Sequence, residues 1–165
     1  LMRLYAAPLT AWDFIIGYAL PLLPMALLQG TVCYAVGFAL GLKISANVLL
    51  ALASLIPAAL LFIGIGLLAG SVFNDKQVGG ICGALLTNLT AWLSGTWFDL
   101  SLVGGAFKAA ADALPFVHAV NAGRAAIAGD ASGMFPDLWW VIGYAALVFG
   151  AAVVVFRRRM KSETA

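Results

Sequence analysis

Residues 46–72 read ANVLLALASLIPAALLFIGIGLLAGSV, and no charged side chain occurs anywhere between Lys43 and Asp75. A helix needs about 20 consecutive apolar residues to cross the hydrocarbon core of a bilayer, which is about 30 Å thick. A charged side chain at the centre of that core costs about 2.5–3.5 kcal/mol on insertion scales. The stretch therefore predicts a membrane-spanning helix.

Other parts of the chain share this lack of charge. Three further intervals contain none: Asp13 to Lys43, Lys76 to Asp99, and Asp137 to Arg157. The chain is 64% hydrophobic and 10% charged, whereas soluble domains are about half apolar and about a quarter charged. This composition excludes a soluble enzyme, a disordered tail and a collagen-like fibre. We predict an all-α integral membrane protein with four transmembrane helices, at residues 14–41, 46–72, 77–98 and 137–157.

The distribution of basic residues predicts the orientation. Four crossings place both ends of the chain on one side, and cytoplasmic loops are enriched in Lys and Arg. Six basic residues then lie on the side of the two ends: Arg3, Lys76, Arg157, Arg158, Arg159 and Lys161. Three lie on the other: Lys43, Lys108 and Arg124. We expect a multi-pass protein of the cell inner or plasma membrane, with residues 1–13 and 158–165 cytoplasmic. The C-terminal basic cluster is interpreted as a stop-transfer anchor, with a lipid-headgroup or partner site as the alternative.

The segment at residues 99–136 differs from the rest. Together with Asp137 it contains four Asp, one Lys and one Arg, and its apolar stretches are too short to span a bilayer. Such lengths predict re-entrant or interfacial helices at the outer surface. We therefore expect a single transmembrane domain, 1–165, with an extracellular re-entrant segment between its last two spans.

Few residues offer catalytic or metal-binding chemistry. Cys33 and Cys82 lack the spacing of a metal site and are interpreted as small packing residues. His118 is the only histidine, and no nucleophile or second ligand lies near it in the sequence. No glycine-rich phosphate loop ending in Lys-Ser or Lys-Thr is present. We expect no enzymatic activity, no metal and no cofactor in this chain.

The predicted helices contain neutral polar side chains instead. Thr87, Thr90 and Ser94 follow the i, i+3, i+7 spacing that places residues on one helix face, and Asn88 is adjacent. One interpretation is hydrogen bonding between or within helices; the other is a mildly polar face on a translocation path. Three GxxxG pairs, at Gly37/Gly41, Gly66/Gly70 and Gly79/Gly83, are expected to permit close helix packing.

Several motifs, in order along the chain, resemble the permease subunits of ABC-2 type transporters. They are RLYAAPLTAWD (residues 3–13) before a long apolar helix, FNDKQ (73–77), GTWFD (95–99) and LPF (114–116). Permeases of that family have six helices, and this chain matches the last four. The resemblance therefore implies a permease fragment that lacks the N-terminal tail and first two helices.

The resemblance also implies a mechanism and partners. Two permease copies would pair with two separate ABC ATPase subunits, which would bind ATP and Mg; the bilayer is the other partner, and no nucleic acid is expected. An ATPase-coupling segment would include Arg3, Pro8, Leu9, Thr10 and Trp12, although these residues could also form a simple interfacial start to the first helix. A translocation path would include Thr87, Asn88, Thr90 and Ser94, and an outer gate would include Gly95, Phe98, Leu114 and Pro115.

The expected function is the membrane-spanning permease subunit of an ATP-driven exporter. Its neutral polar helix face favours a hydrophobic or amphipathic substrate, which would be drug-like, lipid-like or a polysaccharide, over an ion. The alternative is a non-transporting scaffold or sensor subunit of a permease-like complex.

Overall fold

A computed structural model describes residues 10–42 and 45–163, and within these ranges the chain is helical and contains no strand. The helices are α1 (Ala11–Ala39), α2 (Asn47–Val72), α3 (Asp75–Gly80), α4 (Thr87–Leu93), α5 (Gly105–Ala113), α6 (Pro115–Ala128) and α7 (Ala131–Glu163). A π-helical turn, Ile81–Leu86, joins α3 to α4, and a 3-10 turn, Leu100–Leu102, precedes α5.

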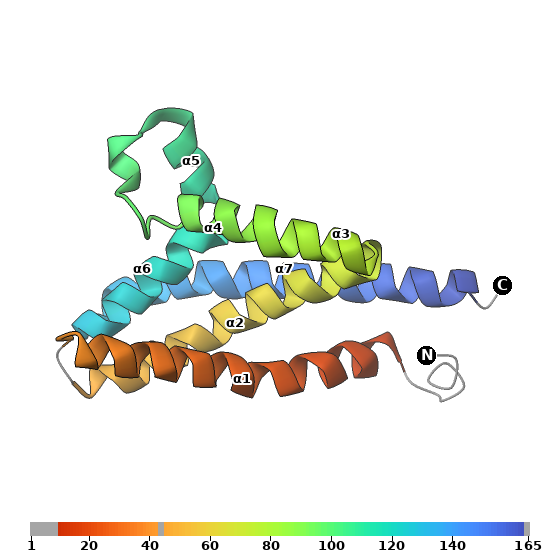
Figure 1. Ribbon diagram of the computed structural model, residues 1–165, viewed down its shortest axis with the longest axis horizontal. Coiled ribbons are helices and arrows are strands. Elements are labelled where there is room, and N and C mark those ends of the chain that lie inside the picture. The colour runs from red at the N-terminus through yellow and green to blue at the C-terminus, as the bar shows by residue number, and fades with distance from the viewer. Residues whose placement is uncertain (1–9, 43–44, 164–165) are drawn as a thin grey trace.

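Three helices are long and apolar enough to cross a membrane: Trp12–Ala39, Asn47–Val72 and Ala131–Arg159. They run along the length of the molecule, and the start of α1, the end of α7 and the turn between α2 and α3 lie at the same end (Figure 1). The predicted third span, 77–98, is divided among α3, the π turn and α4, and its helix ends earlier, at Leu93. A fourth crossing therefore stays a prediction.

The centre of the fold is α2, which packs against α7, α6 and α1. Leu61 of α2 is fully buried against Val141 and Ala145 of α7. Small side chains let α6 approach the same helices, since Ala122 and Ala126 are buried beside Ala51 of α2. Close packing of small residues is the usual basis of helix association in membranes, where burial of apolar surface from water contributes little.

The first helix is attached more loosely. A capping box starts it, in which the Thr10 hydroxyl accepts the Asp13 N–H (3.3 Å) and an Asp13 carboxylate oxygen accepts the Thr10 N–H (2.8 Å). None of its most apolar 18-residue window is buried within the chain. Its exposed side chains include Leu20, Met25 and Leu28. This surface is suited to contact with lipid or with other membrane helices.

The last helix is longer than predicted at both ends. The sequence predicts a span of 137–157, whereas α7 covers Ala131–Glu163 and includes most of the predicted cytoplasmic tail. It begins earlier because Asp130 caps it: the carboxylate accepts the Ser132 hydroxyl (2.7 Å) and the Gly133 N–H (2.9 Å). These two hydrogen bonds hold the pKa of Asp130 below its ordinary value. The preceding Gly129, at φ +79°, ends α6 in the left-handed conformation.

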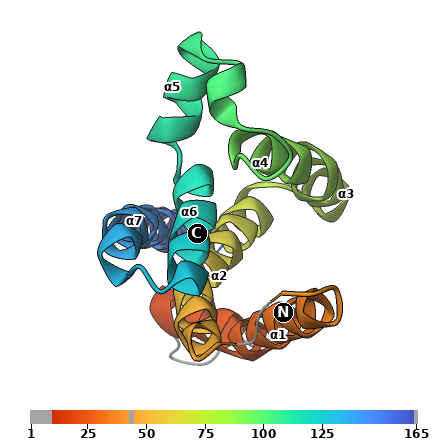
Figure 2. The same ribbon diagram turned by 90° about the vertical axis from the view of Figure 1, so that its left-hand side faces the viewer.

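The segment between α4 and α7 is helical, as predicted, but does not lie uniformly at one surface. Figures 1 and 2 show α5 standing away from the other helices, while α6 runs back along α2 and α7. The amide of Asn47, at the start of α2, donates to the carbonyl of Ile127 near the end of α6 (3.2 Å). The helix α6 is therefore part of the packed helix group, and a re-entrant or interfacial position of residues 99–136 at the outer surface stays a prediction.

Within the described single chain, the GxxxG glycines of α2, α3 and the π turn do not bring helices together, and their packing against a second chain stays a prediction. A Cβ atom added at Gly66, Gly70, Gly79 or Gly83 would meet no heavy atom within 4 Å, so these glycines do not mediate close packing here. Close contacts between helices occur instead at Gly30 of α1, where a Cβ would overlap a methyl of Leu55 on α2, and at Gly64, where a Cβ would lie 3.0 Å from a ring carbon of Phe149 on α7. The motif count missed Gly64 because this glycine belongs to no GxxxG pair.

Candidate functional site

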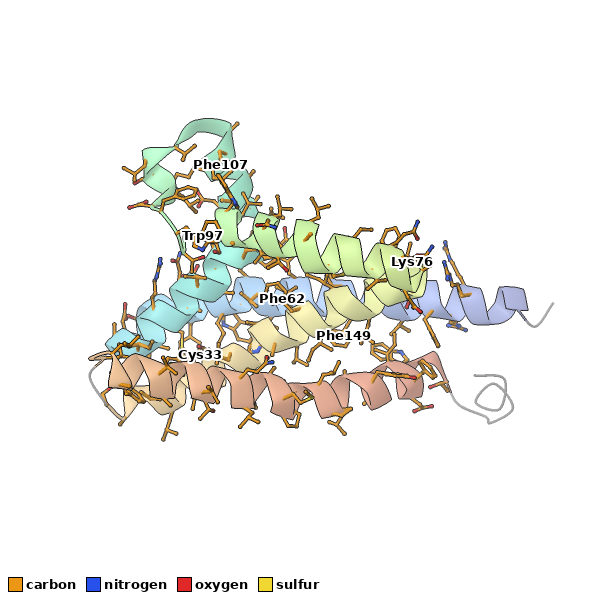
Figure 3. All side chains as sticks on the ribbon, viewed as in Figure 1. Cys33, Phe62, Lys76, Trp97, Phe107 and Phe149 are labelled. Carbon is orange, nitrogen blue, oxygen red and sulfur yellow. The ribbon has the colours of Figure 1, made fainter. Side chains whose placement is uncertain are left out.

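The predicted polar face opens onto a groove between three helices. We call it the threonine groove; it has a volume of about 450 Å³. The residues that line it are Phe62 of α2, Cys82 and Leu86 of the π turn, Thr87, Thr90 and Ala91 of α4, Ser94 and Thr96 after α4, and Phe116, Ala119 and Val120 of α6. Three predicted path residues, Thr87, Thr90 and Ser94, thus share one surface. Phe62 reaches it from α2 (Figure 3).

The π turn at Ile81–Leu86 shapes the part of this surface that precedes α4. A π-helical turn widens the helix by one residue and leaves carbonyl groups without their usual partners. The Thr87 hydroxyl donates to the carbonyl of Cys82, five residues earlier, at 3.0 Å. Glycines around the turn, at 79, 80 and 83, have open space beside them and weaken the regular helix.

The Thr90 hydroxyl differs from its neighbours. It is buried, and within the described residues it has no hydrogen-bond partner. By contrast, the buried Ser94 donates to the carbonyl of Ala91 (3.1 Å) and contacts the hydroxyl of Thr96. A buried hydroxyl without a partner costs about 1–3 kcal/mol. Thr90 therefore lines a mostly apolar groove while its own hydroxyl is buried and unsatisfied.

Asn88 lies outside the groove lining, unlike the other predicted path residues. Its side-chain amide is exposed and donates to the carbonyl of Ala84, one turn earlier, at 2.7 Å. Spacing at i, i+3 and i+7 defines one helix face, and Asn88 is one residue away from that face. The geometry separates Asn88 from Thr87, Thr90 and Ser94.

The predicted gate residues gather where the groove meets α5 and α6. Gly95, at φ +68°, turns the chain after α4, and its carbonyl accepts the guanidinium of Arg124 on α6 (3.0 Å). Phe98 and Leu114 both pack against the buried cluster that contains Leu93 and Phe116. Pro115 starts α6, where its missing N–H and fixed φ are favourable.

A second pocket, of about 490 Å³, lies beside these residues and carries charge of both signs. Lys108 and Asp112 of α5 form an ion pair at 2.5 Å across its rim. Asp99 accepts the Ser101 N–H (2.8 Å), and hydrogen bonding to Ser101, aided by the charges of Lys108 and Arg124, lowers its pKa. These internal contacts account for each of the charged side chains of the pocket.

Comparison with known protein families shows which class of protein this chain belongs to. A family model described as ABC-2 type transporter matches residues 1–128. The chain belongs to the ABC-2 type transporter family. No curated protein and no solved structure matches it. Family membership, together with the three long apolar helices, identifies a membrane-embedded permease component of an ABC transporter. Permeases of this family are generally not catalytic themselves, normally work with an ABC ATPase subunit and dimerise.

The coupling segment of this ABC-2 permease is described only in part. Arg3, Pro8 and Leu9 lie outside the described residues. Thr10 caps α1, and Trp12 is 52% exposed near the start of that helix. An exposed indole at a helix end is typical of the membrane interface. Thr10 and Trp12, the described residues of the predicted coupling segment, therefore lie at the start of the first long helix, and their coupling role stays a prediction.

The structure also brings together residues that the sequence did not connect. His118 of the ABC-2 permease contacts Asp137, which lies 19 residues later, and the carbonyl of Asp112. No local sequence pattern reveals this contact, because it forms only when α5, α6 and α7 pack. Phe62, Phe116, Ala119 and Val120 were missed as groove residues for the same reason. Cys33 is exposed on α1, far from Cys82 along the chain.

Proposed function

We propose that this chain is the membrane-spanning permease subunit of an ATP-driven exporter that moves a hydrophobic or amphipathic substrate. The substrate would be drug-like, lipid-like or a polysaccharide. Energy would come from a separate ABC ATPase, which would bind ATP and Mg. The observation that carries the proposal is the unpartnered hydroxyl of Thr90 in a mostly apolar groove, in a chain of the ABC-2 family.

The chemistry of the threonine groove supports this substrate class. No Asp, Glu, Lys, Arg or His lines the groove, so an ion entering it would lose hydration without gaining a charged partner. An apolar body can contact Phe62 and Phe116. A helix movement that uncovers the buried Thr90 hydroxyl would let it bond to a single polar group of the substrate. Pockets of this kind, apolar with a few placed polar groups, commonly bind small molecules. We propose Thr87, Thr90 and Ser94 as path residues.

Coupling to the ATPase is proposed at the end of the molecule where α1 starts and α7 finishes. The α2–α3 turn with Lys76 lies at the same end (Figure 3), as does the basic run Arg157–Arg159 of α7. The excess of positive charge there favours a cytoplasmic position. Movement of Arg3, Pro8 and Leu9 with the ATPase would be transmitted through the Thr10–Asp13 cap into α1.

Release of the substrate is proposed beyond the C-terminal end of α4, away from the coupling end, where Trp97 lies (Figure 3). Here Gly95, Phe98, Leu114 and Pro115 would act as the outer gate. The left-handed Gly95 and the extended Leu114 form the two bends that position α5. Rotation about these bends would change access to the groove, because Gly95 directly follows the groove residue Ser94.

Co-purification with the ATPase encoded beside the full-length protein tests the partnership. We expect a stable complex, and we expect charge reversal by Arg3→Glu to weaken it at least about tenfold, since unpairing one interfacial charge costs about 2 kcal/mol or more. Lys108→Glu is the matched control, because Lys108 lies on α5, away from the coupling end, and should leave association unchanged. Absence of any complex, or equal loss in both variants, would contradict the proposed coupling.

A further inference from the structure

His118 lies between two hydrogen-bond acceptors on two other helices. Its Nδ1 is 2.5 Å from a carboxylate oxygen of Asp137 on α7, and its Nε2 is 2.8 Å from the backbone carbonyl of Asp112 on α5. The side chains of His118 and Asp137 are 20% and 23% exposed. The His118 imidazole of α6 therefore contacts both α5, which precedes α6 in the sequence, and α7, which follows it.

Counting protons shows what this arrangement requires. A neutral imidazole carries one N–H, and its other nitrogen is an acceptor. A carbonyl and an ionised carboxylate can only accept, so neutral His118 beside ionised Asp137 leaves one nitrogen lone pair facing an oxygen lone pair. Both hydrogen bonds form together only when one more proton is present, either on the second ring nitrogen or on the Asp137 carboxyl. The pair therefore binds one proton, whichever atom carries it.

The surroundings agree with a bound proton. The ring of Trp140, on α7, is centred 5.3 Å from the imidazole ring, a distance at which an aromatic face attracts a cation. On α5 the side chains of Lys108 and Asp112 are paired with each other. Tyr144 of α7 donates its hydroxyl to the carbonyl of Ala113. Neither α2 nor α4 has a charged or titratable side chain, and Arg124 of α6 is directed to the carbonyl of Gly95.

The position of the pair gives the proton a structural effect. The short helix α5 stands away from the long helices, as Figure 2 shows. Few of the described hydrogen bonds hold its end. The described bonds from the end of α5 to α6 and α7 are those of His118 to Asp112 and of Tyr144 to Ala113. Loss of the proton breaks one of the two hydrogen bonds of His118, either the one to the carbonyl of Asp112 or the one to the carboxylate of Asp137. Where the bond to Asp112 is the one lost, Tyr144 supplies the remaining described hydrogen bond to the end of α5, beside the apolar packing of Ala111 in the buried cluster that contains Leu93 and Phe116.

We propose that His118 and Asp137 form a proton-binding site that ties the end of α5 to α6 and α7 when occupied and loosens that end when empty. Because the tie needs the bound proton, it weakens when the pH rises and the proton leaves. Proton binding itself does not depend on the proposed export function. Its consequence for substrate release does, because Leu114 and Pro115 lie between the two tied helices.

Hydrogen exchange of the full-length protein in lipid nanodiscs tests the site. Amide exchange in residues 105–114, corrected for the intrinsic pH dependence of exchange, is measured at about pH 5 and about pH 8. We expect corrected exchange to be about tenfold faster at the higher pH, in keeping with the loss of a hydrogen bond to a charged group. His118→Gln and Asp137→Asn should each abolish this difference between the two pH values.

Tyr144→Phe is the matched control. It removes the other bond to the end of α5 without changing a group that titrates between these pH values, so exchange should rise by a similar factor at both. The proposal would be overturned if corrected exchange still differed between the two pH values in His118→Gln and Asp137→Asn, or if it did not differ in the wild type. The measurement needs neither ATP nor an ATPase, so its result is independent of whether the chain proves to be an exporter.

Discussion

Gly64→Leu is expected to destabilise the protein by about 1–3 kcal/mol, the usual cost of overpacking a tightly filled site. Gly64 is buried where α2 crosses α7. A Cβ there would lie 3.0 Å from a ring carbon of Phe149 and 3.2 Å from a methyl of Val148, before the rest of a leucine side chain is added. Because both neighbours belong to α7, the two helices would have to separate. Thermal unfolding in detergent, followed by circular dichroism, measures the loss.

Gly66→Leu is the control for this variant. Gly66 is two residues further along α2 and is exposed, and a Cβ added there would meet no heavy atom within 4 Å. Both variants replace a glycine by the same helix-favouring residue, so their helix propensities change equally. Gly66→Leu should be at least as stable as the wild type. Equal destabilisation of the two variants would show that α2 and α7 do not pack as described.

Thr90→Val is expected to lower ATP-driven substrate flux about three- to tenfold. A change of this size corresponds to the loss of one hydrogen bond between Thr90 and the substrate in the groove. The same variant should unfold at a higher temperature, since it removes a buried hydroxyl that has no partner in the described chain. Valine has nearly the same shape as threonine, so the groove keeps its volume. Flux in reconstituted vesicles and thermal unfolding of the same preparation are the two measurements.

Thr31→Val is the control for Thr90→Val. Thr31 is exposed on α1, and its hydroxyl donates to the carbonyl of Leu27 one turn earlier (2.8 Å). Such bonds are common in membrane helices and are not expected to contact substrate. Flux should equal that of the wild type. If Thr90→Val gains stability while flux is unchanged, the hydroxyl face of α4 is packing surface and not a path.

The charge-free intervals predicted the bounds of α1 and α2 well. The structure places α2 at Asn47–Val72 against a predicted 46–72, and α1 at Ala11–Ala39 against 14–41. Asp137 lies inside α7, beside His118, so this helix begins before the charge that ended the charge-free interval. A sequence shows where a charge occurs, whereas its partner becomes visible only in the fold.

The candidate site was predictable on one helix only. The spacing of Thr87, Thr90 and Ser94 placed them correctly on one face, which the groove confirms, although their role in transport stays a prediction. The walls from α2 and α6 depend on how helices distant in the sequence pack together. The π turn at Ile81–Leu86 was also missed, because the absence of charge that defined the predicted 77–98 helix carries no information about backbone geometry.

The central claim is that this ABC-2 permease moves a hydrophobic or amphipathic substrate at the expense of ATP hydrolysed by a partner. The most direct test is ATP-driven uptake into inside-out vesicles that contain the full-length protein and its ATPase. An amphipathic dye, a short-chain lipid and an oligosaccharide serve as the three probes. We predict that at least one probe accumulates, that accumulation requires both ATP and the permease, and that probe stimulates ATP hydrolysis. Steady ATP hydrolysis by the assembled complex with no movement of any probe would contradict the account and indicate a scaffold or sensor subunit instead.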